Sequence, residues 1–322
     1  WHTEIQTEPE IVLCALPFFH SYGLTTCLHM AVLLKSMMAL VPNPRDIPTL
    51  LKTIQKERAS LFSGVPTLFV AINNYPDLHR YDLSSIKTCV SGGAPLPLEV
   101  ARQFETVSRG NLVEGYGLSE SSPVTHANPV HGKRKEGSIG LPVPNTDARV
   151  VDPETRKTLP VGEVGELAVR GPQVMRGYWN MEQETRDVLK DGWLFTGDIA
   201  RMDEEGYFYI VDRKKDMIIA GGFNIFPREV EEVLYEHPGV LEAAVIGAPD
   251  EYRGETVKAF IVPKEGASLD PEEIVAFCRK RLAPFKVPRQ IEFRESLPKS
   301  SIGKILRRVL KEEETQGTGP TS

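Results

Sequence analysis

The sequence lacks the features that mark disulfide-rich, zinc-binding and membrane-spanning proteins. Its 322 residues contain four cysteines, which form no C-x-x-C pair or Cys/His cluster: Cys14, Cys27, Cys89 and Cys278. This spacing predicts neither a zinc site nor a disulfide framework and favours a reducing, cytoplasmic compartment. The most apolar window, 22–41, is interrupted by His29 and Lys35. It therefore lacks a run long enough to span a membrane and is expected to form a buried helix followed by a strand.

A basic surface is also missing. The formal net charge is -6 and the pI is about 5.8, whereas a nucleic-acid binder would show a clustered basic face. Short Lys/Arg clusters occur at 133–135, 213–215 and 307–308. Each is flanked by acidic or apolar residues, so each is interpreted as solvated surface, and no nucleic-acid partner is expected.

The length predicts two domains. Residues 1–136 alternate short apolar runs with amphipathic stretches, which is typical of an α/β fold with a mostly parallel sheet. In 137–211, β-favouring runs are separated by Gly, Pro, Asn and Asp, which predicts a small antiparallel β unit. After the charged segment 212–216, residues 217–315 have the pattern of an α+β domain, and 316–322 are expected to be disordered.

Three segments carry residue types suited to a nucleotide. Glu114–Glu120 ends a predicted strand in a Gly-x-Gly turn and then offers a hydroxyl and a carboxylate, which suit phosphate and Mg²⁺. Ser91–Pro95 follows another strand and allows close approach of backbone to a ligand. Asp198 follows Gly197 in a strand and has the character of a ribose-binding acid. Each pattern alone is also typical of an ordinary loop or turn.

A fourth segment, 298–304, is a polar loop that places Lys304 before an amphipathic helix. A mobile cation suits charge that develops on a phosphoryl group, although an isolated lysine near a helix start is commonly a solvated one.

The joint order of these segments resembles the adenylate-forming superfamily of acyl- and aryl-CoA synthetases, peptide-synthetase adenylation domains and beetle luciferases. The resemblance extends from about residue 11 to 308 and rests on these motifs: LPFFHSYG (16–23), SGGAPL (91–96), EGYGLSES (114–121), GSIGLPVPN (137–145), GELAVRGPQVMRGYWN (165–180), DGWLFTGDIA (191–200), VDRKKDMIIAGGFNIFP (211–227) and PKSSIGKILRR (298–308). It implies an N-terminal adenylation domain up to residue 211, a hinge at 212–216 and a mobile C-terminal cap domain at 217–315.

The resemblance also implies where a nucleotide binds. The residues expected around adenine are Tyr116, Ala94, Glu114 and Gly115. Asp198, helped by Arg213, is expected to bind the ribose hydroxyls, and Ser119 is expected to contact the α-phosphate.

The same resemblance implies roles in the chemistry. Glu120 is the expected Mg²⁺ ligand, and Lys304 is expected to bridge the substrate carboxylate and the α-phosphate. Lys215 is the expected pivot of the last domain. The glycine pair Gly221–Gly222 is expected to line the tunnel for the pantetheine arm of coenzyme A, and His20 is assigned to the acyl pocket or its gate.

One departure from the family pattern is large. The Gly/Ser/Thr-rich phosphate loop that precedes the His20 motif has no counterpart here, and the chain opens without Met. The sequence is therefore interpreted as a C-terminal fragment that is inactive alone.

Within the family, the motifs most resemble those of bacterial medium- and long-chain fatty acyl-CoA synthetases. Residues 14–30 contain no acid to pair with an amino group, which disfavours an amino-acid substrate. The expected reaction is ATP-dependent ligation of a fatty acid to coenzyme A, with ATP, Mg²⁺ and coenzyme A as the small-molecule partners. An aryl-CoA ligase is the alternative, and a non-catalytic nucleotide-binding module is the alternative of another class. Chain length, oligomeric state and peripheral membrane contact stay open.

Overall fold

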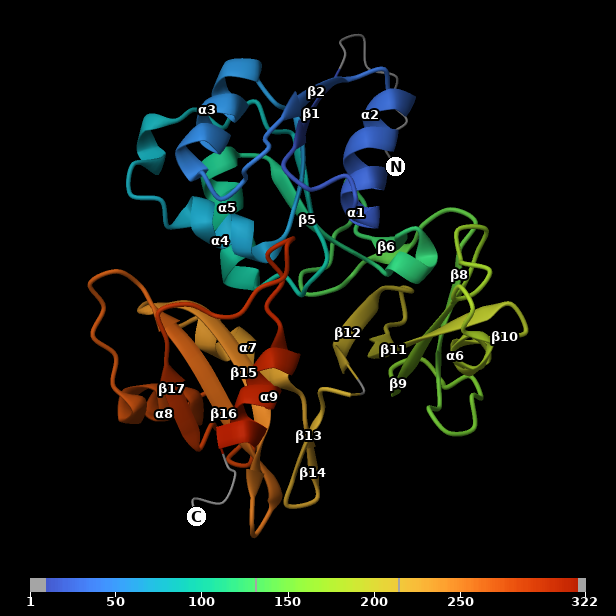
Figure 1. Cartoon of the computed structure of the whole chain (residues 1–322), viewed down its shortest axis with the longest axis vertical. Coiled ribbons are helices and arrows are strands. Elements are labelled where there is room, and N and C mark those ends of the chain that lie inside the picture. The colour runs from blue at the N-terminus through green and yellow to red at the C-terminus, as the bar shows by residue number, and fades with distance from the viewer. Residues whose placement is uncertain (1–9, 131, 214, 318–322) are drawn as a thin grey trace. The chain divides into compact units, whose positions relative to one another are not determined.

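The structure is a computed structural model that describes residues 10–130, 132–213 and 215–317. It divides into two compact units, Trp1–Ile210 and Val211–Ser322, each of which has its own sheets and core (Figure 1). None of the helices in the described ranges is long and apolar enough to cross a membrane.

The first unit is built around a seven-stranded sheet in the order β2-β1-β3-β4-β5-β6-β7. The first five strands of that order are parallel, and the last two pairings are antiparallel. The strands are β1 (Ile11–Cys14), β2 (Met37–Leu40), β3 (Leu61–Gly64), β4 (Thr88–Ser91), β5 (Asn111–Gly117), β6 (Val124–Ala127) and β7 (Leu141–Pro142). This confirms the predicted α/β class.

Short helices connect these strands. They are α1 (Ser21–Gly23), the π-helix η1 (Leu24–His29), α2 (Met30–Leu33), α3 (Ile47–Glu57), α4 (Pro66–Asn73), the 3₁₀ turns η2 (Leu78–Arg80) and η3 (Ser119–Ser121), and α5 (Leu98–Ser108). The sequence defines α3 locally, because the Asp46 side chain accepts the Thr49 N–H at 3.1 Å and caps the helix. Leu50, Leu51 and Ile54 lie on its buried face.

A second, antiparallel sheet completes the first unit, as predicted for 137–211. Its strands are β8 (Asp147–Val151), β9 (Val164–Arg170), β10 (Leu189–Lys190), β11 (Trp193–Met202) and β12 (Phe208–Arg213), whose last three residues belong to the second unit, and α6 (Glu182–Val188) precedes β10. The β11–β12 turn contains Gly206 at φ 83°, the left-handed conformation that glycine adopts without steric cost.

In the residues that the structure describes, the second unit is a five-stranded sheet with three helices. The strands are β13 (Ile218–Ala220), β14 (Phe223–Ile225), β15 (Val240–Asp250), β16 (Gly254–Pro263) and β17 (Gln290–Phe293), and the helices are α7 (Pro227–Tyr235), α8 (Pro271–Arg279) and α9 (Arg307–Gly317). Asp270 caps α8 by accepting the Glu272 N–H at 2.8 Å. The prediction that 316–322 is disordered is wrong for 316 and 317, which belong to α9, and residues 318–322 lie outside the described ranges.

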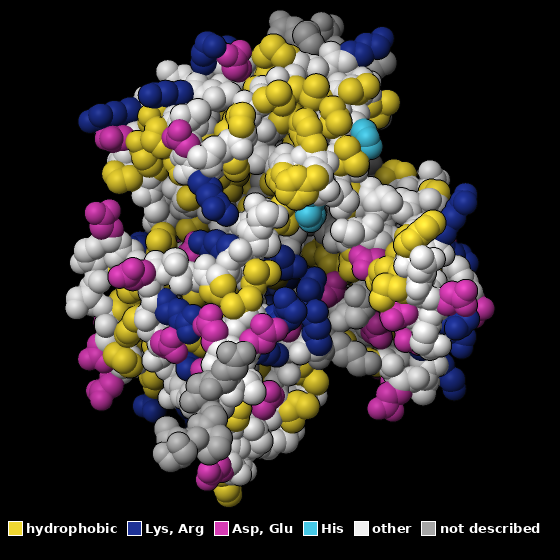
Figure 2. Space-filling view, viewed as in Figure 1, with side chains coloured by type: hydrophobic (Ala, Val, Ile, Leu, Met, Phe, Trp, Pro, Cys, Tyr) yellow, Lys and Arg dark blue, Asp and Glu magenta, His cyan; other side chains and the backbone are white. Residues whose placement is uncertain are grey.

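The predicted helix and strand of window 22–41 are present, but the helix, which was expected to be buried, is buried only in part: Cys27 and Ala31 are buried, whereas Val32 and Leu33 are exposed. Hydrophobic side chains gather over η1, α2 and β2 at the top of Figure 2. The exposed ones are Val32, Leu33, Met37, Met38 and Leu40. Hydrophobicity predicted the elements correctly, whereas burial depends on what packs against them.

The interpretation of the Lys/Arg clusters as solvated surface is wrong at two positions. The side chains of Lys135 and Arg307 are only 19% and 17% exposed, and both are ion-paired. Arg308 fits the expectation, with 85% of its side chain exposed. Lys214 lies outside the described residues.

Candidate active site

The predicted nucleotide-binding segments meet at one edge of the seven-stranded sheet. β4 and β5 are parallel neighbours, and Ser91 lies opposite Glu114. Residues 92–95 therefore leave the sheet beside the Glu114–Gly117 segment. Ligands of open α/β sheets bind outside the carboxyl ends of the strands, and this edge is such a place.

Glycine is required at position 92, where the chain leaves β4. The Tyr22 ring lies against Gly92, where an added Cβ would come within 2.9 Å of the ring. The Tyr22 hydroxyl donates to the Val90 carbonyl at 2.8 Å, which fixes the ring between the ends of the strands.

Tyr116 and Asp198 come together although they are 82 residues apart in sequence. The Tyr116 hydroxyl donates to Asp198 Oδ2 at 2.5 Å, which joins the end of β5 to the middle of β11. Asp198 is buried, and its N–H donates to Thr196 Oγ1 at 3.2 Å. The preceding Gly197 N–H donates to Glu166 Oε1 at 3.0 Å. The acid is thus a fixed acceptor and not an ordinary exposed turn residue.

A buried histidine supports the tyrosine ring. His126 on β6 lies opposite Tyr116, and its ring makes edge contacts with Tyr116 and with Phe208 at centroid distances of 6.0 and 4.8 Å. Thr125 Oγ1 lies 2.9 Å from His126 Nδ1. The imidazole therefore packs between the end of β5 and β12.

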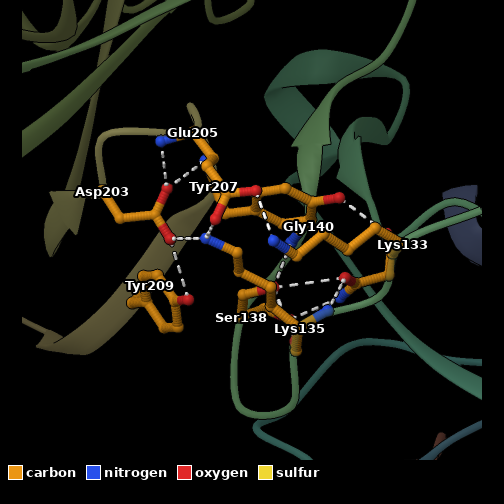
Figure 3. Close-up of polar contacts among 9 residues, drawn as sticks. Lys133, Lys135, Ser138, Gly140, Asp203, Glu205, Tyr207 and Tyr209 are labelled. Atoms are coloured by element: carbon orange, nitrogen blue, oxygen red, sulfur yellow. Dashed lines mark hydrogen bonds and ion pairs between the residues drawn. The ribbon is translucent and has the colours of Figure 1, made fainter.

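A charged cluster ties the same two sheets together (Figure 3). Lys135 Nζ contacts Asp203 Oδ2 at 2.6 Å and Glu205 Oε1 at 2.8 Å. Tyr207 donates its hydroxyl to the Lys133 carbonyl at 2.6 Å. Segment 133–140 is thereby attached to the β11–β12 hairpin.

Lys135 and Asp203 shift each other's pKa. Burial acts to raise the pKa of Asp203, but hydrogen bonds from Lys135, Tyr207 and Tyr209 outweigh it and lower this pKa to about 2. Hydrogen bonds to Asp203 and Glu205 raise the pKa of Lys135. The cluster therefore stays ionised at neutral pH and attaches segment 133–140 to the β11–β12 hairpin.

Ser119 and Glu120 lie beside each other in η3, as predicted. Ser119 is exposed, and its Oγ lies 3.4 Å from the Ser21 hydroxyl, which brings the two motifs together. The Glu120 Oε1 atom accepts the Tyr178 hydroxyl at 2.7 Å. Burial, followed by this hydrogen bond, raises the pKa of Tyr178 to about 12.

His20, the residue assigned to the acyl pocket or its gate, has a local structural role. Its Nδ1 accepts the Tyr22 N–H at 3.1 Å and caps α1. Its position next to Ser21 places it near Ser119 in the fold. The assignment to an acyl pocket stays a prediction.

The predicted residues of the second unit lie at opposite ends of β15. Gly221 N–H donates to the Arg253 carbonyl at 2.9 Å, beside the β15–β16 turn. The Lys304 hairpin is attached near the other end, where Lys299 Nζ contacts Glu242 Oε1 at 2.6 Å. Glu242 and Asp250 are eight positions apart on β15, or roughly 26 Å at the usual rise of a strand. Figure 1 shows the two features at the two ends of this unit.

Hydrogen bonds between Ser300 and Lys304 close the hairpin that carries Lys304. Ser300 N–H donates to the Lys304 carbonyl at 2.8 Å, and the Lys304 N–H donates to Ser300 Oγ at 3.2 Å. Gly303 in this turn has φ 85°. The backbone of Lys304 is thus fixed, while its side chain is at the end of a hairpin.

Arg213 and Lys215 belong to the segment that begins the second unit. Arg213 accepts at its carbonyl from Asp216 N–H and Met217 N–H, at 3.0 and 3.2 Å. The Lys215 carbonyl accepts from Lys311 Nζ at 3.4 Å. The roles of Arg213 at the ribose and of Lys215 as a pivot stay predictions.

Three aromatic residues of the site escaped the sequence reasoning: Tyr22, His126 and Tyr178. Tyr22 and Tyr178 lie inside motifs that had been recognised, so their position in HSYG and GYWN was the available signal. His126 carries no such signal, because a histidine in an apolar strand is typical of an ordinary core position.

His126 also predicts how the first unit responds to acid. Burial lowers its pKa to about 3, below the ordinary value near 6.5. The unfolded chain therefore binds more protons than the folded one as pH falls below about 6.5, and the stability lost is roughly 1.4 kcal/mol per pH unit.

We expect the free energy of unfolding to fall by about 2 kcal/mol more in the parent than in His126→Phe between pH 7 and pH 5. Trp179 and Trp193 belong to the first unit, and the sequence of 211–322 contains no tryptophan. Tryptophan fluorescence in urea titrations therefore reports the right unit. Equal losses in the two proteins would contradict the assignment of a buried neutral imidazole.

Comparison with known proteins identifies the family of the chain. The family model described as AMP-binding enzyme matches residues 1–179, and that of the AMP-binding enzyme C-terminal domain matches 229–304. A long-chain-fatty-acid–CoA ligase of Bacillus subtilis is 57% identical over 98% of this chain and 56% of its own length. The ligase of that name from Yersinia pestis is 49% identical over 97% of this chain and 55% of its own length.

Solved structures show the same fold. ATP-bound MatB of Rhodopseudomonas palustris superposes with a TM-score of 0.85 at 34% identity, over 95% of this chain and 60% of that one. The chain thus spans little more than half the length of the curated relatives named above. With one family model covering its first 179 residues and a second covering much of the rest, the chain belongs to the AMP-binding enzyme family.

Proposed function

We propose that this chain belongs to an ATP-dependent fatty acid–CoA ligase and takes part in both steps of its reaction. In the first step a carboxylate oxygen attacks the α-phosphate of ATP, and pyrophosphate leaves. In the second step the thiolate of coenzyme A attacks the acyl carbonyl, and AMP leaves. The observation that carries the proposal is the Tyr116–Asp198 pair at the carboxyl edge of the sheet, together with relatives of that name at 49–57% identity.

The nucleotide would be bound by residues from both sheets of the first unit. Tyr116 offers an aromatic face, and residues 92–94 and 114–115 offer backbone at the strand ends. A buried carboxylate that is already held by a tyrosine can accept hydrogen bonds from two ribose hydroxyls without reorganising. Ser119, which is exposed beside Glu120, offers a hydroxyl to phosphate.

Magnesium fits the residues present. The described residues contain no group of three or more His, Cys, Asp or Glu that could hold a metal by themselves. Mg²⁺ is commonly bound by one or two carboxylates together with substrate phosphates. Glu120 suits this role, because its carboxylate has acceptor positions beyond the one used by Tyr178. The ion would neutralise phosphate charge when bound there.

Asp198→Asn tests the nucleotide site in the 322-residue chain itself. Asparagine keeps an oxygen that can accept from Tyr116, but it loses the charge and replaces one acceptor with a donor. Charge-assisted hydrogen bonds contribute about 1.5–3 kcal/mol each. We therefore expect AMP affinity, measured by isothermal titration calorimetry, to fall on the order of ten- to a hundredfold.

The matched control for this variant is Asp147→Asn. Asp147 is exposed and pairs with Arg170 at 2.7 Å, so AMP affinity should not change. Unchanged affinity in Asp198→Asn would contradict the assignment of the ribose site.

The reaction itself is tested in a chimaera that joins the upstream half of the Bacillus subtilis relative to this chain. The chimaera should form acyl-CoA from a long-chain fatty acid, ATP and coenzyme A. Activity with aryl acids and none with fatty acids would favour the aryl-CoA ligase instead, and AMP binding without either product would favour a nucleotide-binding module.

A further inference from the structure

Arg307 lies at the centre of a cluster of carboxylates in the second unit. Its Nε donates to Glu231 Oε1 at 3.0 Å, and its Nη2 donates to Glu231 Oε2. Its Nη1 lies 3.7 Å from Asp212 Oδ1 and 3.6 Å from Asp216 Oδ2. All three carboxylates are at most 15% exposed. One largely buried cation therefore compensates three largely buried anions, whose charges would be costly if left unpaired.

Two of these carboxylates also hold the backbone. Asp212 accepts from Arg213 N–H at 2.7 Å and from Arg228 N–H at 2.9 Å. Glu231 Oε1 accepts the Val245 N–H of β15 at 2.8 Å. The cluster thus joins the segment 212–216 to the start of α7 and to the central hairpin of the unit.

The two aspartates lie on either side of Lys215. Asp212 precedes it and Asp216 follows it, and both contact Arg307. A large change of φ or ψ at Lys215 would have to separate Arg307 from at least one of them. Lys311 adds a weaker contact to the same turn, with Nζ 3.9 Å from Asp216 Oδ1. Arg307 therefore stabilises the observed turn around Lys215.

Arg307 is also next to the Lys304 hairpin. The Leu306 N–H donates to the Pro298 carbonyl at 2.8 Å and closes the base of that hairpin. Arg307 follows Leu306 and is the first residue of α9. The side chain that holds the turn at Lys215 thus extends from the base of the hairpin that carries Lys304.

We propose that Arg307 is a positioning residue that locks the turn around Lys215 and, at the same time, the base of the Lys304 hairpin. The catalytic consequence rests on the proposed function, whereas the lock itself does not. A general stabilising ion pair is the simpler alternative. The two differ in where the effects of removing Arg307 appear.

Hydrogen exchange on the 322-residue chain tests the lock directly. The amides of Asp216 and Met217 donate to the Arg213 carbonyl and report the turn. In Arg307→Met their exchange should rise on the order of tenfold or more while the β15–β16 ladder keeps its protection, because only a local opening is made easier. Arg307→Lys should restore part of the protection. The control is Arg308→Met, whose side chain is exposed and pairs with Glu312 at 3.6 Å.

Glu231→Gln is the second variant, in case Arg307→Met does not fold. It keeps the arginine and its contacts with the two aspartates while weakening the anchor to α7. It should raise exchange at 216–217 by several-fold. Unchanged exchange at 216–217 in a folded Arg307→Met or Glu231→Gln protein, or a uniform rise across the whole unit, overturns the lock.

The catalytic consequence of the lock is tested in the chimaera. Arg307→Met should lower the rate of adenylate formation more than that of thioester formation, with KM for ATP unchanged. Combined with Lys304→Ala it should cause little further loss, because residues that act through one another are not additive. An additive loss overturns the positioning role. A parent chimaera without ligase activity would refute the proposed function. The hydrogen-exchange result would still show whether Arg307 locks the turn around Lys215.

Discussion

Replacing Lys304 by alanine in the chimaera is expected to slow adenylate formation by on the order of a hundredfold or more. Negative charge accumulates when the carboxylate attacks the α-phosphate, and a positioned cation stabilises that charge. Thioester formation from preformed acyl-adenylate is an attack on a neutral acyl carbonyl and places no new charge on the phosphate, so it should be far less affected. The measurement compares pyrophosphate release from ATP and fatty acid with acyl-CoA formation from synthetic acyl-adenylate.

The structure offers a matched control on the same hairpin. Lys299 carries the same charge, but its Nζ contacts Glu242 at 2.6 Å, so Lys299→Ala should affect both half-reactions alike. The backbone bonds of Lys304 to Ser300 do not involve its side chain, and alanine should leave the hairpin intact. If Lys304→Ala slowed both half-reactions equally, the residue would have no special role in activating the carboxylate.

Local sequence signals predicted most elements of the fold. The bounds of α3 agree with local signals in the sequence, because Asp46 is a side-chain cap and the apolar residues of 47–57 recur at helical spacing. The antiparallel β unit followed from its turn residues. Hydrophobicity alone would place Val32 and Leu33 in a core, yet both are exposed, because burial depends on what packs against a residue and not on its hydrophobicity.

In the candidate site, too, the sequence identified residues, whereas the contacts between them depend on packing. Family motifs identified Tyr116 and Asp198, but their hydrogen bond depends on how two sheets pack and could not be read from positions 82 apart. The adjacent pair Arg307–Arg308 is a sharper case. The two residues cannot be told apart by residue type, yet Arg307 is largely buried among carboxylates and Arg308 is exposed to solvent. Helix phase, set by where α9 begins, makes that difference.

The pair of sites on the second unit explains why a pivot is expected. Lys304 and the Gly221–Gly222 turn are assigned to successive steps of one reaction, yet they lie at opposite ends of β15 (Figure 1). A single pose of this unit relative to a substrate could not present both. Motions of this kind are absorbed by a few residues that undergo large φ/ψ changes, and Lys215 is the candidate.

Lys215→Pro in the chimaera is therefore expected to keep much of the adenylation activity and to lose most thioester formation. Proline fixes φ near -65° and restricts the residue before it, so the turn could no longer reach a second conformation. The same two assays measure the effect. Lys215→Ala removes the same side chain but leaves φ free, and the Lys215 carbonyl that accepts from Lys311 is present in both variants.

The comparison of these two substitutions separates the backbone from the side chain. A pivot predicts that alanine is tolerated in both assays and that proline blocks only the second. If alanine and proline lose thioester formation alike, the lysine side chain and not the flexibility of the turn is what matters. If the proline variant forms acyl-CoA from acyl-adenylate at the parental rate, Lys215 is not the pivot, and the two ends of β15 must reach the substrate through motion elsewhere in the chain.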